Sequence, residues 1–149
     1  MKRNDRLSVA LHVLLHMAER GDNPMTSAEM AACVDTNPVV IRRTFAGLRE
    51  AGIVTSDKGH GGGWRLAKPP GEIALVDVQR ALGERILPLA MHEESPGCLV
   101  ERAVIEAVDD ALAEAERVVE ARLASLTLAD LAQRVQHLSA VTGHKLKGA

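Results

Sequence analysis

The sequence is poor in aromatic residues. It contains one Phe, one Trp and no Tyr among 149 residues, although 46% of its residues are hydrophobic. Any core must therefore be filled by Ala, Leu, Val and Ile, a composition that favours helices. The length allows one ordinary domain or a small head with additional helices, and it excludes two large independent domains.

Cysteine is scarce, and long apolar runs are absent. Two cysteines give no disulfide framework, which is typical of a reducing cytoplasm. No segment approaches the roughly 20 apolar residues that a membrane span requires. Lys2 and Arg3 precede an apolar stretch at residues 7–18, but polar residues interrupt it and no small-residue cleavage site follows. We expect a cytoplasmic protein with no membrane partner.

The charges are distributed unevenly. A net charge of -2 argues against a nucleic-acid partner, because neutralising phosphates requires Lys and Arg. Residues 37–68, however, carry six basic and two acidic side chains, a balance of +4, whereas residues 98–138 carry four basic and eight acidic ones, a balance of -4. The first region is predicted to meet an anion, and the second is not.

Apolar periodicity and capping signals predict a mainly helical chain with one small β-ribbon. Thr26 and Glu29 form a capping-box pattern, and Asn37 before Pro38 is typical of a helix start. Short β-branched or apolar segments flank a glycine-rich turn and predict the ribbon. The expected helices are residues 7–20, 26–34, 38–51, 73–82, 98–123 and 127–137, and the expected strands are residues 53–56 and 64–66.

This order of elements is that of a winged helix-turn-helix, whose third helix enters the major groove of DNA while the ribbon lies along the backbone. Arg42 is expected to read a guanine edge and Arg43 to contact a phosphate. Ile41, Phe45 and Leu48 are expected to face the core. Glycines in the turn let backbone amides approach a sugar-phosphate chain closely. The candidate DNA-binding residues are Lys2, Arg3, Arg6, Asn37, Val39, Val40, Arg42, Arg43, Arg49, Lys58, Gly59, His60 and Gly61.

The helix expected at residues 98–123 would be roughly 39 Å long and would extend past a small head. Its apolar stripe needs a cover, and a second copy of the chain is the simplest one, so we expect a homodimer. The expected organisation is a head at residues 1–83, a loop at 84–97, dimerisation helices at 98–138 and a tail at 139–149. The candidate interface residues are Val104, Val108, Ala111, Leu112, Ala115, Val119 and Leu123.

Other functions have weaker support in the sequence. A nucleotide cradle would need a GK[ST] loop before a helix, whereas the glycine-rich turn here precedes a strand. His12 and His16 are one helical turn apart, but they are expected to be core or surface residues, so no metal site is predicted. No catalytic set is apparent, so an enzyme is not expected. A winged-helix module for protein-protein assembly remains the alternative function.

Four segments resemble the Rrf2 family of bacterial transcriptional regulators: RLSVAL at residues 6–11, NPVVIRR at 37–43, LREAGIV at 48–54 and, most specifically, GHGGGWRLA at 59–67. The resemblance covers roughly residues 2–135. It implies a winged helix-turn-helix head, a long helix that crosses its twin in a dimer, and regulation at near-palindromic operators. The predicted function is sequence-specific DNA binding as a homodimer, most simply as a repressor.

The resemblance also raises the question of an iron-sulfur cluster, which many family members hold through three cysteines before the long helix. Here that loop offers only Cys98, so a cluster lacks two of its three thiolate ligands even if His92 supplied a nitrogen. The chain resembles the cluster-free subgroup, and no cofactor is expected. Cys98 and His92 are candidate sensor residues for a redox or small-molecule signal, with a thiol that merely packs as the alternative for Cys98.

Overall fold

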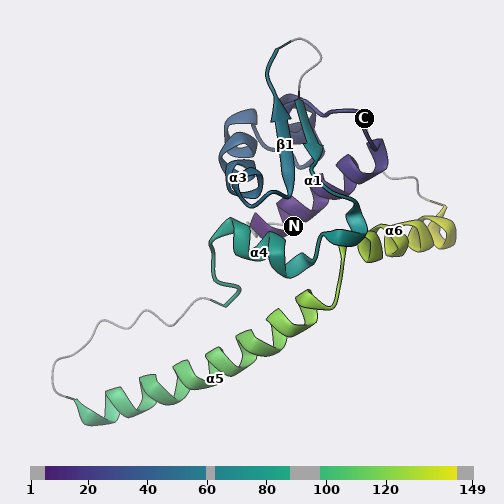
Figure 1. The fold of residues 1–149 in the computed structure, drawn as a ribbon. Helices are drawn as coiled ribbons and strands as arrows, with labels where there is room; N and C mark the ends of the chain where they lie inside the picture. The colour runs from purple at the N-terminus through teal and green to yellow at the C-terminus, as the bar shows by residue number, and fades with distance from the viewer. Residues whose placement is uncertain (1–5, 60–62, 88–97, 144–149) are drawn as a thin grey trace.

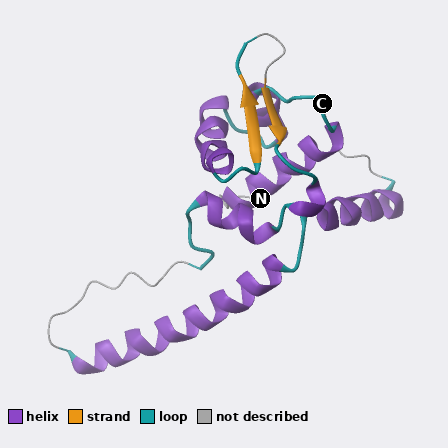
Figure 2. Ribbon diagram, viewed as in Figure 1, coloured by secondary structure: helices purple, strands orange, loops and turns teal. Residues whose placement is uncertain are grey.

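A computed structural model of the chain describes residues 6–59, 63–87 and 98–143. These residues form six α-helices, one 3-10 turn and one two-stranded antiparallel sheet (Figures 1 and 2). The mainly helical fold class with a small ribbon is therefore confirmed. The elements are α1 (Arg6–Arg20), α2 (Ser27–Cys33), α3 (Pro38–Glu50), β1 (Val54–Asp57), β2 (Gly63–Leu66), η1 (Pro70–Glu72), α4 (Leu75–Leu82), α5 (Leu99–Ala124) and α6 (Leu128–Thr142).

The head, residues 6–83, is built around one apolar core to which α1, α3, α4 and the sheet contribute. The two aromatic rings of the chain meet in it: Phe45 and Trp64 pack edge to face, with their ring centroids 5.8 Å apart. This geometry suits the charge distribution of aromatic rings. The other large, fully buried side chains are aliphatic or Met, as the composition requires.

The sheet is the ribbon that the sequence predicts. Its register pairs Val54 with Leu66 and Asp57 with Gly63. Trp64 also exchanges two backbone hydrogen bonds with Met25, donating at 2.8 Å and accepting at 2.9 Å. A Cβ atom on Gly63 would lie 2.7 Å from the carbonyl oxygen of Met25. The close approach of these backbones therefore requires a glycine at the start of β2.

The two C-terminal helices pack against the head to different extents. The connection from α5 to α6 runs beside the start of α4, where Leu75 N–H donates to the Leu126 carbonyl and Leu128 N–H donates to the Ile73 carbonyl, both at 2.9 Å. The helix α6 then packs against α1 and η1, with Leu128 fully buried. By contrast, α5 extends away from the head and buries none of its residues (Figure 1).

The last helix is longer than the sequence analysis expects. A capping box formed by Thr127 and Asp130 starts α6 as predicted, but the helix continues past residue 137 to Thr142. It ends where Gly143 adopts a left-handed conformation with φ of 66°. The helix end is thus set by the first residue that adopts this conformation without strain, and the expected tail at 139–149 begins too early. No helix among the described residues is long and apolar enough to cross a membrane.

Helices α1 and α6 line an open cavity of about 200 Å³, in which His12 and His16 of α1 face Val135 and Gln136 of α6. The side chain of His16 is buried, and that of His12 is more exposed. Burial and, secondarily, the neighbouring His16 lower the pKa of His12. The imidazole of His12 is therefore neutral at pH 7.

We expect the substitution Gly47→Ala to destabilise the fold, although Ala is the better helix former by about 1 kcal/mol. A Cβ atom at residue 47 would lie 2.5 Å from the Ala81 carbonyl oxygen, so α3 and α4 must move apart. Such overpacking costs about 1–3 kcal/mol, which urea unfolding measures. Gly71→Ala is the control, because a Cβ atom there meets nothing within 4 Å. Equal stability of both variants and the wild type would contradict the close packing of α3 on α4.

Candidate nucleic-acid interface

The start of α3 is fixed by two adjacent residues. The Asn37 side chain accepts hydrogen bonds from the amides of Val39 and Val40, at 3.0 and 3.1 Å, and Pro38 occupies the first turn. The predicted N-cap is therefore confirmed. Its side-chain oxygen is used inside the protein, so only the amide nitrogen of Asn37 is left for the predicted DNA contact.

The two faces of α3 differ completely in their exposure. Ile41, Phe45 and Leu48 are fully buried on the core side, as predicted. On the other side Val39 and Val40 are 60% and 42% exposed, and Arg42 and Arg43 are exposed as well. We call these four residues the outer face of α3. It combines two cationic side chains with apolar ones small enough to approach a base edge.

The first turns of α3 carry positive charge. The first turn contains no acidic residue. The helix dipole adds a partial positive charge at the same place, so an anion is favoured there. Within the described part of the chain, neither Arg42 nor Arg43 forms an ion pair. Both guanidinium groups are thus available to an external partner.

The predicted residues Arg49 and Arg6 have partners inside the protein. Arg49 donates to the Ser56 hydroxyl at 3.1 Å, and its guanidinium carbon lies 5.8 Å from the centroid of the Trp64 ring. It thereby joins the end of α3 to the base of the ribbon. Arg6 donates to the Glu84 carboxylate at 2.7 Å, and both side chains are substantially exposed. A phosphate would have to compete with that carboxylate for Arg6.

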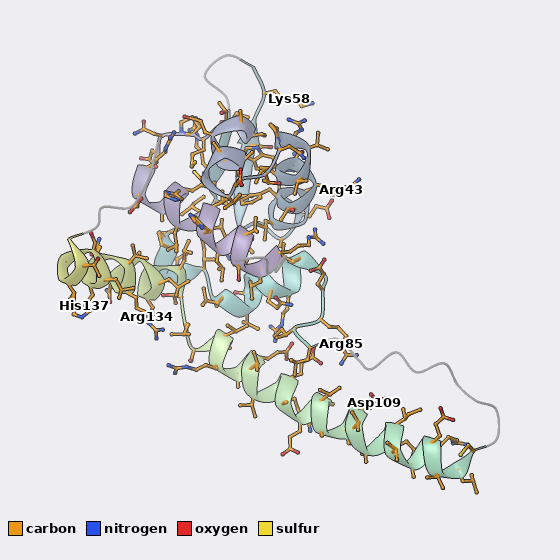
Figure 3. The ribbon with its side chains drawn as sticks, turned by 180° about the vertical axis from the view of Figure 1, so that it is seen from behind. Arg43, Lys58, Arg85, Asp109, Arg134 and His137 are labelled. Atoms are coloured by element: carbon orange, nitrogen blue, oxygen red, sulfur yellow. The ribbon has the colours of Figure 1, made fainter. Side chains whose placement is uncertain are left out.

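The ribbon extends beyond the core on the side of the molecule that also presents α3. Lys58 follows β1, and Gly59 has a φ of 96°, a conformation that favours glycine. Figure 3 shows Lys58 and Arg43 pointing outward from the same side of the head. Within the ribbon, the Arg65 guanidinium forms an ion pair with the Asp57 carboxylate, with a nitrogen-to-oxygen distance of 3.5 Å. The other predicted contacts, Lys2, Arg3, His60 and Gly61, lie outside the described residues.

A hollow of about 450 Å³ lies between the N-terminal half of α1 and the start of α3, with Arg6 and Arg43 in its lining. Asp35 and Thr36, from the turn between α2 and α3, also line it. Sequence reasoning did not identify these two residues, although Asp35 precedes the N-cap by only two positions. Asp35 adopts a φ of 52°, an uncommon conformation for a residue other than glycine, in the turn between α2 and α3.

The predicted dimerisation residues form a partly covered stripe on α5. None of the seven is buried, and Val104 and Val108 are 55% and 42% exposed. The three toward the C-terminal end, Leu112, Val119 and Leu123, are half-buried, in a helix that contacts α4. The structure thus leaves the N-terminal part of the apolar stripe exposed.

The segment after α4 is tied to α5 by one carboxylate. Arg85 donates to Glu116 at 2.6 Å, and Figure 3 shows Arg85 pointing toward α5 on the side from which Asp109 projects. The hydrogen bond from Arg85, with weaker ones from the amides of Ile86 and Leu87, lowers the pKa of the Glu116 carboxyl. Cys98 is the exposed N-cap residue of α5. The other candidate sensor residue, His92, lies outside the described residues.

Comparison with known proteins places the chain among bacterial regulators. It is 37% identical to the HTH-type transcriptional regulator YwnA of Bacillus subtilis over 86% of this chain and 95% of that protein. A solved structure assigned to DNA binding is 34% identical, covers 85% of this chain and 98% of its own, and superposes with a TM-score of 0.67. A transcriptional regulator from Lactobacillus plantarum shares the fold with a TM-score of 0.75 at 23% identity, over 93% and 95% of the two chains.

The model of the Rrf2 family, described as an iron-dependent transcriptional regulator, matches residues 3–134. The residues of this chain do not fit an iron-sulfur cluster. Cys33 packs against the core from α2, so Cys98 is the one cysteine in the segment between α4 and α5. Iron-sulfur clusters are held by several thiolates. The match therefore concerns the fold and the regulator class, and the iron chemistry does not extend to these cysteines.

The family match spans most of the chain, and the ribbon, the helix-turn-helix and the long α5 occur in the order that the resemblance implies. The matched family and the curated relative are both described as transcriptional regulators. The chain is a winged helix-turn-helix protein of the Rrf2 family of transcriptional regulators.

Proposed function

We propose that the protein binds specific duplex DNA sequences as a homodimer and that the outer face of α3 reads the bases. The observation that carries this proposal is the exposed, cationic start of α3, whose opposite face is fixed in the core. A side chain on a rigid helix is positioned precisely enough to distinguish base edges. Arg42 takes a guanine edge, and Arg43 and Lys58 contact phosphates on either side.

Homodimerisation is proposed because the apolar stripe on α5 is largely exposed. Its exposed members include Val104 and Val108, and an isologous contact between two copies buries the stripe of both chains with one set of residues. Two heads related by a two-fold axis present two copies of α3, so the operator is a near-palindrome. Its half-sites lie about 34 Å apart or at a multiple of that distance. Occupation of such a site excludes other proteins from it, so the simplest regulatory effect is repression.

The signal is proposed to act on the segment before α5, as a redox change or a small molecule. Cys98 is exposed at the N-terminus of α5, where an oxidant can reach its thiol. The preceding segment is attached to α5 through Arg85 and Glu116. A change at Cys98 therefore occurs beside the helix on which the dimer depends.

Replacing Arg42 by Ala should weaken binding to the preferred site by about 1–3 kcal/mol and relax the preference at one base pair, because a bidentate base contact is lost. Lys58→Ala should weaken binding to all sequences about equally and reduce the salt dependence by about one counterion. Selection of bound sites from random DNA identifies the site, and fluorescence anisotropy then measures the affinities.

The matched control is Arg134→Ala, which also removes one exposed arginine. Figure 3 places Arg134 on α6, on the face away from the head, so the DNA affinity should not change. If neither Arg42→Ala nor Lys58→Ala alters DNA binding, the outer face of α3 does not read DNA. The alternative, a winged-helix module for assembly with an acidic protein partner, would then be favoured.

The substitution Val108→Glu should convert the dimer to a monomer, because a carboxylate on the stripe would be buried without a partner. Ala121→Glu adds the same charge at an exposed position on the other side of α5 and should leave the dimer intact. Sedimentation equilibrium at several concentrations measures both masses, and circular dichroism checks the folding. A wild-type protein that is monomeric at the concentrations used for DNA binding would contradict the proposal.

Mild oxidation should lower DNA binding by the wild type and leave Cys98→Ser unaffected, if Cys98 is the sensor. Mass spectrometry establishes the oxidation state while anisotropy follows the affinity of the same sample. An oxidised Cys98 with undiminished DNA binding would assign the thiol to packing, and it would leave a small molecule as the signal.

A further inference from the structure

We propose that His12 and His16 form an open two-histidine site for a late first-row divalent metal ion such as Zn²⁺, in the cavity between α1 and α6. The residues lie at positions i and i+4 of α1, and their Nε2 atoms are 3.2 Å apart. This site is separate from the cysteines and from the DNA interface, and it does not depend on the proposed function.

The distance between the two Nε2 atoms suits a shared metal ion. Two imidazole nitrogens bound to one tetrahedral Zn²⁺ at about 2.0–2.1 Å are about 3.3 Å apart. The observed separation is therefore within about 0.1 Å of that required. The two rings are nearly parallel, with an interplanar angle of 28° and centroids 5.1 Å apart. Because the second side-chain torsion of His is broad, small rotations can direct both lone pairs to one ion.

Glu19 lies beside His16, one helical turn further along α1. Its carboxylate lies 3.6 Å from Nδ1 of His16, on the side of the ring opposite to Nε2. A carboxylate there favours the tautomer with the proton on Nδ1, which leaves the Nε2 lone pair directed at His12. Carboxylates that accept a hydrogen bond from a metal-binding imidazole orient it from outside the coordination shell, and a small movement of the Glu19 side chain would bring it to hydrogen-bond distance. Glu19 is thus a positioning residue of the site.

The cavity supplies space for the remaining ligands. Its volume of about 200 Å³ exceeds several times the roughly 30 Å³ of one water molecule. Leu15, Ala132 and Val135 make most of its lining apolar, and Gln136 adds an amide oxygen. The described residues contain no group of three or more His, Cys, Asp or Glu side chains placed to hold a metal. The site therefore keeps open positions for water or for a small ligand that binds the ion.

Imidazole nitrogens select the class of ion. They suit Zn²⁺, Ni²⁺ and Cu²⁺, whereas Mg²⁺ and Ca²⁺ require oxygen ligands. A bound ion would contact α1 directly and fill the space against α6, so it would bind the folded chain with α6 docked. Metal binding should therefore raise the melting temperature.

The test uses the full-length protein without a histidine tag, treated with chelator and then titrated with Zn²⁺ in competition with a chromophoric chelator. The wild type should bind one ion per chain at this site. His12→Gln and His16→Gln should each lose that binding by more than about tenfold, and Glu19→Gln should weaken it by about tenfold. His12→Cys, which restores a metal-binding side chain, should recover the site.

His137→Gln is the matched control. It removes a histidine from α6 that Figure 3 shows on the face away from α1, and it should bind Zn²⁺ as the wild type does. His16 is buried, so its variant also requires a circular dichroism spectrum, whereas His12 is exposed enough to be replaced without loss of the fold. Melting temperatures with Zn²⁺ and with Mg²⁺ give a second measurement, and only Zn²⁺ should raise that of the wild type.

Unchanged Zn²⁺ affinity and stoichiometry in folded His12→Gln would overturn the proposal, and so would a wild type that binds Zn²⁺ no better than Mg²⁺. In either case the short contact between the rings would be a hydrogen bond between the two imidazoles only. DNA plays no part in these measurements, so their failure leaves the proposed regulator function intact.

Discussion

The packing around Trp64 is the contact on which the head depends. Its ring packs against Phe45 of α3, its indole N–H donates to the Ser27 hydroxyl of α2 at 3.0 Å, and its backbone pairs with Met25. One residue thereby connects the ribbon to both helices of the helix-turn-helix. Because the chain has no other ring to pack with Phe45, the relative placement of α3 and the ribbon rests largely on this contact.

The placement of α3 against the ribbon and the core decides which of its faces is buried and which is exposed. Packing of Phe45 and Leu48 into the core determines which side of α3 faces outward. The outer face must then carry Val39, Val40, Arg42 and Arg43, whatever the net charge of the chain. The overall acidity resides instead in the C-terminal part, on residues that a DNA duplex need not approach.

The head contacts α5 through α4 and the residues that follow it. Backbone hydrogen bonds join the start of α4 to the connection before α6, and Arg85 donates to the Glu116 carboxylate. The N-terminal part of α5 extends away from the head (Figure 1).

The sequence alone predicted the helices, the ribbon, the caps at Thr26 and Asn37 and the inward face of α3, because each depends on periodicity or on neighbouring residues. It missed the end of α6, since several residues before Gly143 also allowed an end, and it placed Arg6 and Arg49 on DNA without their internal partners. Only the tertiary structure brought Glu84 to Arg6, packed α6 onto α1 and placed the histidine pair at the wall of an open cavity. Those contacts join residues far apart in the chain, and no local pattern encodes the distance between them.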